Sequence, residues 1–300
     1  MAAQDGLTDS PSGKKTLPVR WSPGKKTPAP TSLSKTADDI RSLACQMCFE
    51  AQSGHLASSL SMVDILTTLF FSEMVWPAEA EKRDDFILSK GHGAPGLYAA
   101  LIRKGILESS LIADLRKWGI PLQGHPDVRR LPEVEITSGA LGQGLSMALG
   151  RAIAIRMKGQ KRHVYCVIGD GESQEGQIWE AALFGGNQDL SHFVAFTDFN
   201  AAQSDGSLSD VLPLGELEKK WTAFGWFVQS VDGHDIEALR NAIARAKSKN
   251  DSRPNMILAH TQKGYVAKGF VVAEGDHSRI LTAQDFDCVR RYLGAENSLQ

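Results

Sequence analysis

The 300-residue sequence contains no apolar run near the roughly 20 residues that a membrane-spanning helix needs. It has no excess of positive charge: 33 basic and 35 acidic side chains give a net charge of −2, which does not suit a nucleic-acid-binding protein. Four scattered cysteines are too few for a disulfide scaffold, and no internal repeat is present. We therefore expect a cytoplasmic protein that binds neither membranes nor nucleic acid.

The first 35 residues show almost no apolar periodicity. They contain five prolines, two Lys-Lys pairs and many serines and threonines, so they bury too little surface to offset the entropy of ordering them. We predict a disordered or loosely docked arm over residues 1–35. A transit peptide is a weaker interpretation, because arginine is nearly absent and no amphipathic pattern is present. Folded sequence should begin near Thr36, so the predicted domain covers residues 36–300.

The most informative stretch runs from Gly169 to Gly206. An apolar, β-branched run at 164–168 precedes it, an Ala- and Leu-rich helical pattern covers about 175–186, and a second apolar run follows at 193–196. This order predicts strand, turn, helix and strand. In such a unit the two strands run parallel and end at the same edge of the sheet, where ligands bind in α/β proteins.

Polar residues follow both strands of this unit. Asp170, flanked by Gly169 and Gly171, ends the first strand, and Asn200 lies thirty positions later, just past the second. The two glycines let the backbone turn sharply and approach a phosphate closely. A carboxylate and an amide oxygen suit Mg²⁺, which completes its shell with water and phosphate. The pattern predicts a magnesium-bridged diphosphate at the sheet edge, although the Gly-Asp-Gly tripeptide alone is also compatible with a simple tight turn.

The string Gly-Asp-Gly-Glu-Ser-Gln-Glu-Gly-Gln-Ile-Trp-Glu-Ala-Ala at 169–182, with its distance to Asn200, resembles the transketolase branch of the thiamine diphosphate-dependent enzymes. The resemblance implies a three-layer α/β/α domain with a central, mostly parallel sheet that binds the cofactor's diphosphate. It also implies that the side chains of Asp170 and Asn200 and the backbone carbonyl of Ala202 bind Mg²⁺, which Ca²⁺ or Mn²⁺ can replace. The other implied cofactor contacts of this unit are Gly169, Gly171, Glu172 and Glu175, the last at the contact between cofactor domains.

Three histidine-containing segments also resemble transketolase loops. Ser-Gly-His, Ser-Lys-Gly-His-Gly-Ala-Pro and Gly-His-Pro occur in the family's order. The resemblance implies that His55, His92 and His125 are catalytic acid/base groups, and that His92 also lies near the diphosphate, where an imidazole can donate to a phosphate oxygen. Taken alone, His55 is also compatible with a polar loop residue and His92 with a solvated turn residue. Leu56-Ala57 stands where the family usually has Pro-Gly, so the shape of the first loop and the acceptor substrate are open.

Two more segments resemble the family. Thr137–Gly144 is rich in small residues, which let the backbone come close to a ring or a phosphate, and the resemblance implies that Gly139 and Leu141 contact the cofactor. The Thr-Gln-Lys-Gly-Tyr stretch at 261–265 resembles a family segment that precedes a histidine of the active-site funnel. His277 is the candidate for that catalytic histidine here.

Hydrophobic periodicity predicts the remaining elements. Thr36 is the expected N-cap of the first helix, with Asp38 and Asp39 in its first turn. Further helices are expected at about 61–71, from 97 onward, at 109–118, up to 158, and at 214–224, 236–247 and 282–293. Strands are expected at 85–89, 226–231 and 254–260.

The resemblance extends from about residue 36 to 280 and corresponds only to the N-terminal, diphosphate-binding part of a full transketolase. In the family a glutamate of a separate pyrimidine-binding domain activates the cofactor, and no position here matches that motif. We therefore expect a split enzyme, active only with a C-terminal transketolase subunit in an α₂β₂ heterotetramer. Together the chains would transfer a two-carbon ketol unit from a ketose or keto acid donor to an aldehyde acceptor.

Two other functions are open at the level of sequence. The chain is also compatible with a subunit of a thiamine diphosphate-dependent 2-keto-acid decarboxylase or dehydrogenase, against which the three histidine segments argue. A non-catalytic, cofactor-binding homologue is the second alternative, against which Asp170 and Asn200 argue. The sequence identifies neither the donor and acceptor substrates nor the pathway.

Overall fold

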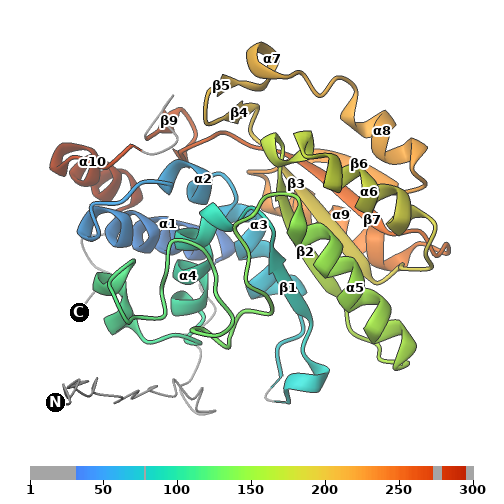
Figure 1. Cartoon of the computed structure of the whole chain (residues 1–300). Helices are drawn as coiled ribbons and strands as arrows, with labels where there is room; N and C mark the ends of the chain where they lie inside the picture. Colours follow the sequence, from blue (N-terminus) through green and yellow to red (C-terminus); the bar gives the residue numbers. More distant parts are fainter. Residues whose placement is uncertain (1–31, 78, 273–278, 295–300) are drawn as a thin grey trace, which may run out of the picture.

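A computed structural model describes residues 32–77, 79–272 and 279–294. Its centre is a five-stranded sheet with the strand order β1-β2-β3-β7-β6, in which every neighbouring pair is parallel. Helices cover both faces of this sheet, so the predicted three-layer α/β/α fold is confirmed (Figure 1). The strands of the sheet are β1 (Asp85–Leu88), β2 (Val164–Gly169), β3 (Phe193–Phe199), β6 (Phe227–Asp232) and β7 (Asn255–His260).

The central strands are buried on both faces. All of β2 and all of β3 except its last residue are buried, which is the near-continuous apolar pattern of a parallel strand between two helical layers. Side chains alternate along β2: Tyr165 and Val167 belong to one hydrophobic cluster, and Cys166 and Ile168 belong to the other. The predicted unit of strand, turn, helix and strand is therefore confirmed.

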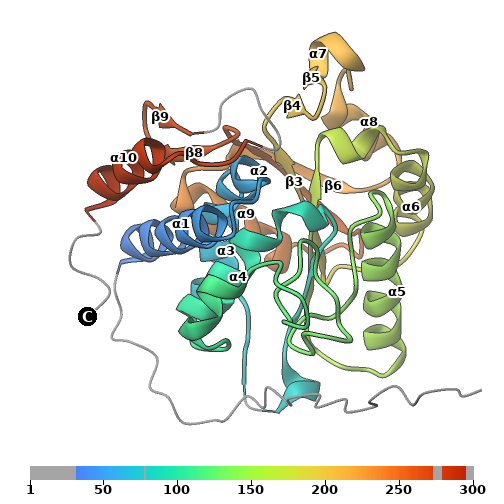
Figure 2. The ribbon, with the colours of Figure 1, turned by 60° about the vertical axis from the view of Figure 1, so that its left-hand side comes forward.

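Two helical layers enclose the sheet, and Figure 2 shows one on each side of it. The layer that packs with Tyr165 contains α1 (Leu33–Glu50), α2 (Leu56–Leu60), α3 (Val63–Thr68), α4 (Ala94–Arg103), α9 (Ile236–Ser248) and α10 (Ala283–Leu293). The layer that packs with Cys166 contains α5 (Gln143–Met157), α6 (Gly176–Gly186) and α8 (Leu217–Ala223).

Short elements connect these layers and lie mostly at the edge where the strands end. Two small antiparallel sheets pair β4 (Ala202–Gln203) with β5 (Gly206–Ser207) and β8 (Tyr265–Ala267) with β9 (Phe270–Val271). The remaining short helices are a π-helix at Leu69–Glu73, 3-10 turns at Ala80–Lys82, Gly91–Gly93, Ser109–Asp114 and Gly171–Gln174, and α7 (Leu208–Val211).

The structure corrects the expected start of the first helix. Ser32 is the N-cap, and its hydroxyl accepts a hydrogen bond from the Lys35 N–H, so the helix begins before Thr36. Asp38 and Asp39 consequently lie beyond the first turn. Residues 33–35, which the sequence places in the N-terminal arm, belong to α1, and residues 1–31 of that arm lie outside the described residues.

Two other predicted helices are wrong in their extent. The helix expected at 61–71 begins earlier, at α2, and is interrupted at Met62, whose backbone leaves the helical region before α3. The helix expected at 109–118 is only a 3-10 turn, because Leu115 leaves the helical region with a ψ of 126° and Arg116 has a φ of +63°. Across the described ranges, none of the helices combines the length and apolar character that crossing a lipid bilayer requires.

Gly186, at the end of α6, packs closely against Phe224, the residue that follows α8, and a substitution at Gly186 tests this packing. A Cβ there would lie 1.6 Å from the Phe224 carbonyl oxygen, so Gly186→Ala should lower the free energy of unfolding by about 1–3 kcal/mol, the usual cost of overpacking. Gly176, at the start of the same helix, faces open space, so Gly176→Ala is the matched control and should cost nothing. Denaturant unfolding measures both variants, and equal stability of the two would contradict this packing.

Candidate active site

Asp170 lies at the carboxyl edge of the sheet, directly after β2. One of its carboxylate oxygens accepts a hydrogen bond from the Gly171 N–H at 2.8 Å, and the other accepts from the Ala201 N–H at 2.5 Å. The parallel register, which pairs Gly169 with Asp198, brings the ends of β2 and β3 to the same level. The structure thus places Asp170 against the 200–202 turn, as the sequence predicts.

The turn after β3 is shaped by its own side chain and by an unusual backbone. Asn200 Oδ1 accepts a hydrogen bond from the Ala202 N–H at 3.2 Å, and Asn200 Nδ2 lies 3.5 Å from Asp198 Oδ2. Ala201 has a φ of +58°, a left-handed conformation that a non-glycine residue rarely adopts. Asp170, Asn200 and Ala202, the three predicted metal ligands, therefore belong to one compact group of residues.

A buried ion pair, between Lys90 and Asp198, lies next to the predicted metal ligands. Lys90 donates to Asp198 and to the Ser58 carbonyl, while hydroxyl groups of Ser61 and Thr261 donate to Asp198 at 2.6 and 2.5 Å. Burial raises the pKa of Asp198, but the Lys90 ammonium and the two hydroxyls outweigh it and hold that pKa below its usual value. Asp198 is therefore a charged carboxylate whose two oxygens both accept hydrogen bonds, and it holds the end of β3 in place.

The surroundings of Asp170 fit a cation. This side chain is 2% exposed, and burial together with the negative Asp198 raises its pKa to about 6, against the opposing effect of hydrogen bonds from Gly171 and Ala201 and of the Lys90 charge. A divalent cation beside the carboxylate would offset this desolvation. The oxygen-only donors suit Mg²⁺, which takes few protein ligands and fills the rest of its shell with water and phosphate.

Glu172 joins three segments near the edge of the sheet. Its buried carboxylate accepts hydrogen bonds from the Ser89 hydroxyl at 2.5 Å and from the N–H groups of Gly142 and Gly169, each at 2.9 Å. Burial raises the pKa of Glu172, and these three donors oppose the rise. These contacts hold the end of β1, the end of β2 and the 137–144 loop together next to the site.

The 137–144 loop approaches the end of β1 closely. A Cβ on Gly91 would lie 2.8 Å from the Gly139 nitrogen, and Gly139 itself has a φ of +140°. Only glycine permits this contact of two backbones. Leu141 is half-buried in the same loop, and Gly142 packs against Glu175, the predicted residue at the contact between cofactor domains.

The three predicted histidines gather above this loop. The ring centres of His55 and His92 are 5.9 Å apart, those of His55 and His125 are 6.5 Å apart, and His125 packs on Gly139. Burial, then the positive charge of Arg116, lower the pKa values of His55 and His125, so both are held toward the neutral form. Segments separated by about 70 residues thus form one histidine cluster over the candidate cofactor loop.

Two basic residues of this site are not assigned a role by sequence reasoning. Arg116 lies beside the histidine cluster. Lys263 donates to the Gln203 carbonyl at 3.2 Å. The N–H of the next residue, Gly264, donates to the Ala57 carbonyl at 2.9 Å. The Lys-Gly of the 261–265 segment was the available signal for Lys263. For Arg116 no pattern marks the residue, because its partner is 61 positions away. His277 lies outside the described residues.

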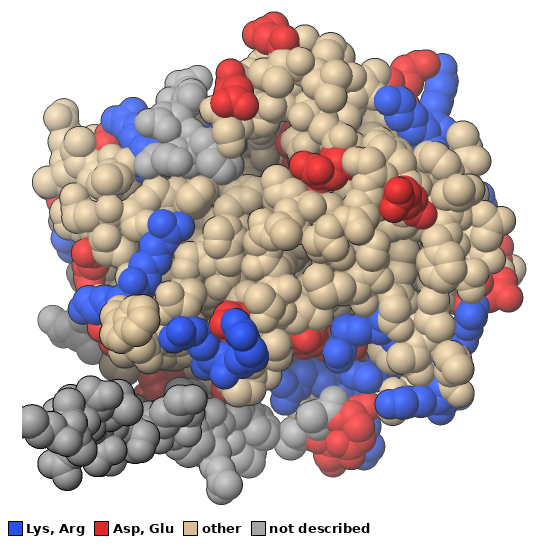
Figure 3. Space-filling model, viewed as in Figure 1, with Lys and Arg blue, Asp and Glu red and all other residues tan. Residues whose placement is uncertain are grey.

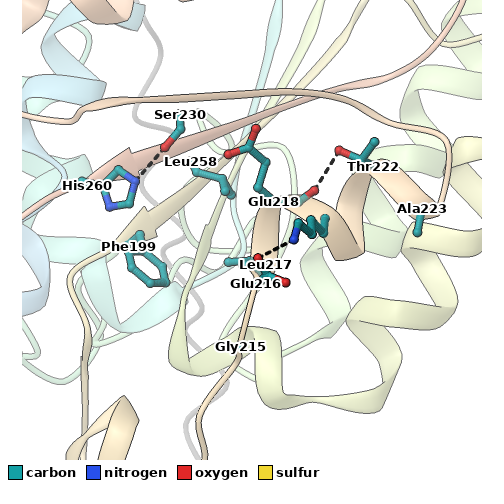
Figure 4. A pocket seen from close by; sticks show the side chains of 11 residues that line it. Phe199, Gly215, Glu216, Leu217, Glu218, Thr222, Ala223, Ser230, Leu258 and His260 are labelled. Atoms are coloured by element: carbon teal, nitrogen blue, oxygen red, sulfur yellow. Dashed lines mark hydrogen bonds and ion pairs between the residues drawn. The ribbon is translucent and has the colours of Figure 1, made fainter.

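A separate cavity of about 710 Å³ lies beside the site (Figure 4). Phe199 lines it, whereas the next residue, Asn200, belongs to the predicted metal group. His260, at the end of β7, and Ser230, within β6, are joined by a 2.7 Å hydrogen bond and line the cavity. Residues of α8 form the opposite wall, and none of the predicted site residues that the structure describes lines this cavity.

Comparison with known proteins agrees with this geometry. Residues 32–299 match the model of the transketolase, thiamine diphosphate-binding domain family. The 6-deoxy-6-sulfo-D-fructose transketolase subunit of Clostridium sp. (strain MSTE9) is 43% identical over 262 residues, which cover 84% of this chain and 92% of that protein. An apulose-4-phosphate transketolase subunit of Phocaeicola vulgatus is 34% identical over 262 residues, which cover 85% of this chain and 92% of that protein.

Solved structures give the same result. The transketolase from Leishmania mexicana superposes with a TM-score of 0.80 at 29% identity and covers 88% of this chain, but the chain spans only 41% of that protein. The matched region, the sheet edge with Asp170 and Asn200, and the histidine cluster all lead to one conclusion. The chain belongs to the transketolase family and represents its N-terminal, thiamine diphosphate-binding domain.

Proposed function

We propose that this chain is the N-terminal subunit of a two-chain transketolase. It binds Mg²⁺ and thiamine diphosphate and, with a partner subunit that carries the pyrimidine domain, transfers a two-carbon ketol unit from a ketose or keto acid to an aldehyde. The observation that carries this proposal is the hydrogen bond from the Ala201 N–H to the Asp170 carboxylate, which brings the predicted metal ligands together at the edge of the sheet.

Each part of the site has a role in this proposal. Asp170, Asn200 and the Ala202 carbonyl hold the metal, and the loops of Gly169–Gly171 and Gly139–Leu141 approach the diphosphate and the rings. When bound, thiamine diphosphate supplies the carbanion chemistry that cleaves and forms the carbon–carbon bond. Glu172 and Glu175 orient these loops through the contacts described above.

The histidines handle substrate oxygens and protons. His92 follows Gly91, whose backbone contacts Gly139, and suits a phosphate oxygen, whereas His125 packs on Gly139 and the His55 ring lies close to both other rings. Lowered pKa values keep His55 and His125 neutral near physiological pH, the form that exchanges protons with hydroxyl and carbonyl groups. His277 is proposed to complete this set of catalytic histidines.

Several observations support a separate partner subunit. Two of the relatives are named as transketolase subunits, and this chain matches 92% of the length of each, against 41% of a solved transketolase. Figure 3 shows a face whose middle carries few charged side chains. Helices α5 and α6 also expose Met147, Leu183 and Phe184 by 39%, 55% and 50%, which suits a covered interface. An α₂β₂ assembly is the arrangement that we propose, in a reducing cytoplasm that fits the free cysteines.

The names of the relatives suggest a class of donor. One is named for 6-deoxy-6-sulfo-D-fructose and the other for apulose 4-phosphate, both sugars with an anionic group. We therefore propose a ketose donor that carries a terminal sulfonate or phosphate.

The first prediction concerns the metal ligand. Asp170→Asn keeps the size of the side chain but removes its charge. The affinity for Mg²⁺–thiamine diphosphate should therefore fall by more than about tenfold, because loss of a residue that only hydrogen-bonds to a metal ligand already lowers metal affinity by roughly 10–100-fold. Calorimetric titration of the full chain, with thermal unfolding as a second readout of ligand binding, measures this change. Asp205→Asn, on the exposed β4–β5 turn, is the control and should bind normally. Unchanged affinity of Asp170→Asn would refute the assigned metal site.

The second prediction concerns the partner. The purified chain alone, saturated with Mg²⁺ and thiamine diphosphate, should not consume a ketose phosphate in the presence of an aldehyde acceptor. Addition of a C-terminal transketolase subunit should produce turnover, because in this proposal that subunit supplies the pyrimidine domain. Ketose consumption and product formation can be followed by chromatography. Robust turnover by the single chain would exclude the split active site.

A further inference from the structure

Arg116 and His55 form a contact beside the histidine cluster. Arg116 Nη2 lies 2.9 Å from His55 Nδ1, although the two residues are 61 positions apart. The guanidinium packs over Gly124, where an added Cβ would lie 2.8 Å from Arg116 Nε. A glycine beside His125 thus leaves the space that the guanidinium occupies.

The chemistry of this contact fixes the protonation state of one ring nitrogen. A guanidinium only donates hydrogen bonds and stays charged at any physiological pH. His55 Nδ1 must therefore accept, with its lone pair directed at Arg116. The neutral ring then carries its proton on Nε2, so the contact selects one tautomer of His55.

The backbone holds both partners in this arrangement. His55 has a φ of +72° and Arg116 a φ of +63°, left-handed conformations that are unfavourable for non-glycine residues and persist only where the surroundings impose them. The Arg116 N–H donates to the Leu122 carbonyl at 2.7 Å, and the carbonyl of His55, the N-cap of α2, accepts from the Ser59 N–H within that helix. Two strained residues that face each other are typical of a functional site rather than of a loop that only connects elements.

The charges around His55 act in the same direction. Arg116 reaches it from the loop after the 3-10 turn at 109–114, Lys263 from the segment after β7, His125 from the 124–126 loop and His92 from the turn before α4. Burial first, then Arg116, His125 and Lys263, lower the pKa of His55. Protonation of the His55 imidazole, which would place a second positive charge beside that of Arg116, is therefore unfavourable.

We propose that Arg116 is a positioning residue that holds His55 as the neutral Nε2–H tautomer, so that His55 donates a hydrogen bond to a substrate oxygen instead of acting as a general base. The identity of that oxygen, a carbonyl or hydroxyl of the ketose or aldehyde, rests on the proposed function. The tautomer does not, because the contact exists in the chain itself. This narrows the acid/base role expected of His55 and leaves proton removal to the other histidines.

The tautomer can be observed directly in the full, cofactor-free chain. Histidine labelled with ¹⁵N gives separate NMR signals for protonated and bare ring nitrogens, and His55→Gln assigns the signals of His55. The wild-type protein should show a protonated Nε2 and a bare Nδ1 at neutral pH. In Arg116→Met the titration midpoint of His55 should rise, because the neighbouring cation is lost, and the single tautomer should give way to a mixture.

Two further variants show whether the change in the His55 signals comes from losing the Arg116 charge and contact or from a general loss of structure. Arg116→Lys keeps the cation and one donor, so it should retain most of the lowered midpoint. Lys117→Met removes an exposed charge next in sequence, which pairs with Asp114 at 3.1 Å, and should leave the His55 signals unchanged. In the reconstituted two-chain enzyme, Arg116→Met should shift the acidic limb of the kcat/KM profile to higher pH, because neutral His55 is the active form.

A wild-type His55 that is protonated on Nδ1, or charged at neutral pH, would overturn the proposal, and so would an unchanged His55 signal in Arg116→Met. If instead the chain failed to bind thiamine diphosphate while the NMR result held, the proposed function would fail and the tautomer assignment would stand. The two results are thus distinguishable.

Discussion

The parallel pairing of β2 with β3 is the constraint on which the rest of the site depends. Its register sets Gly169 opposite Asp198, so both strands end at one level and the Asp170 carboxylate meets the Ala201 N–H. A slip of one residue would turn every side chain of a strand to the other face of the sheet and would separate these groups. The apolar residues on both faces of these strands, which pack against two helical layers, hold the register in place.

Charge compensation explains why two buried carboxylates can lie next to each other. Lys90, Ser61 and Thr261 satisfy Asp198, which therefore stays ionised within the protein. The remaining carboxylate, Asp170, has its pKa raised to about 6 by burial and by Asp198, and a divalent cation is the group whose binding would offset that burial. The same edge of the sheet thus combines a satisfied structural charge with a carboxylate suited to a metal.

Much of this arrangement follows from local sequence pattern. Alternating and continuous apolar runs define the strands, and the Gly-Asp-Gly turn and the histidine segments mark the site because each is short and contiguous. Contacts made across the fold carry no such pattern: Lys90 meets Asp198 over 108 positions, and Arg116 meets His55 over 61. The break of the predicted 61–71 helix at Met62 was also missed, since tertiary packing rather than helix propensity decides it.

The most direct test of the account is crystallographic. The chain would be crystallised, alone or with its C-terminal partner, in the presence of Mn²⁺ and thiamine diphosphate, and the manganese located by its anomalous scattering. We expect a single strong peak within coordination distance of the Asp170 carboxylate, Asn200 Oδ1 and the Ala202 carbonyl oxygen, with the diphosphate bound to the same ion. A cofactor whose metal lies away from Asp170 and Asn200 would contradict it.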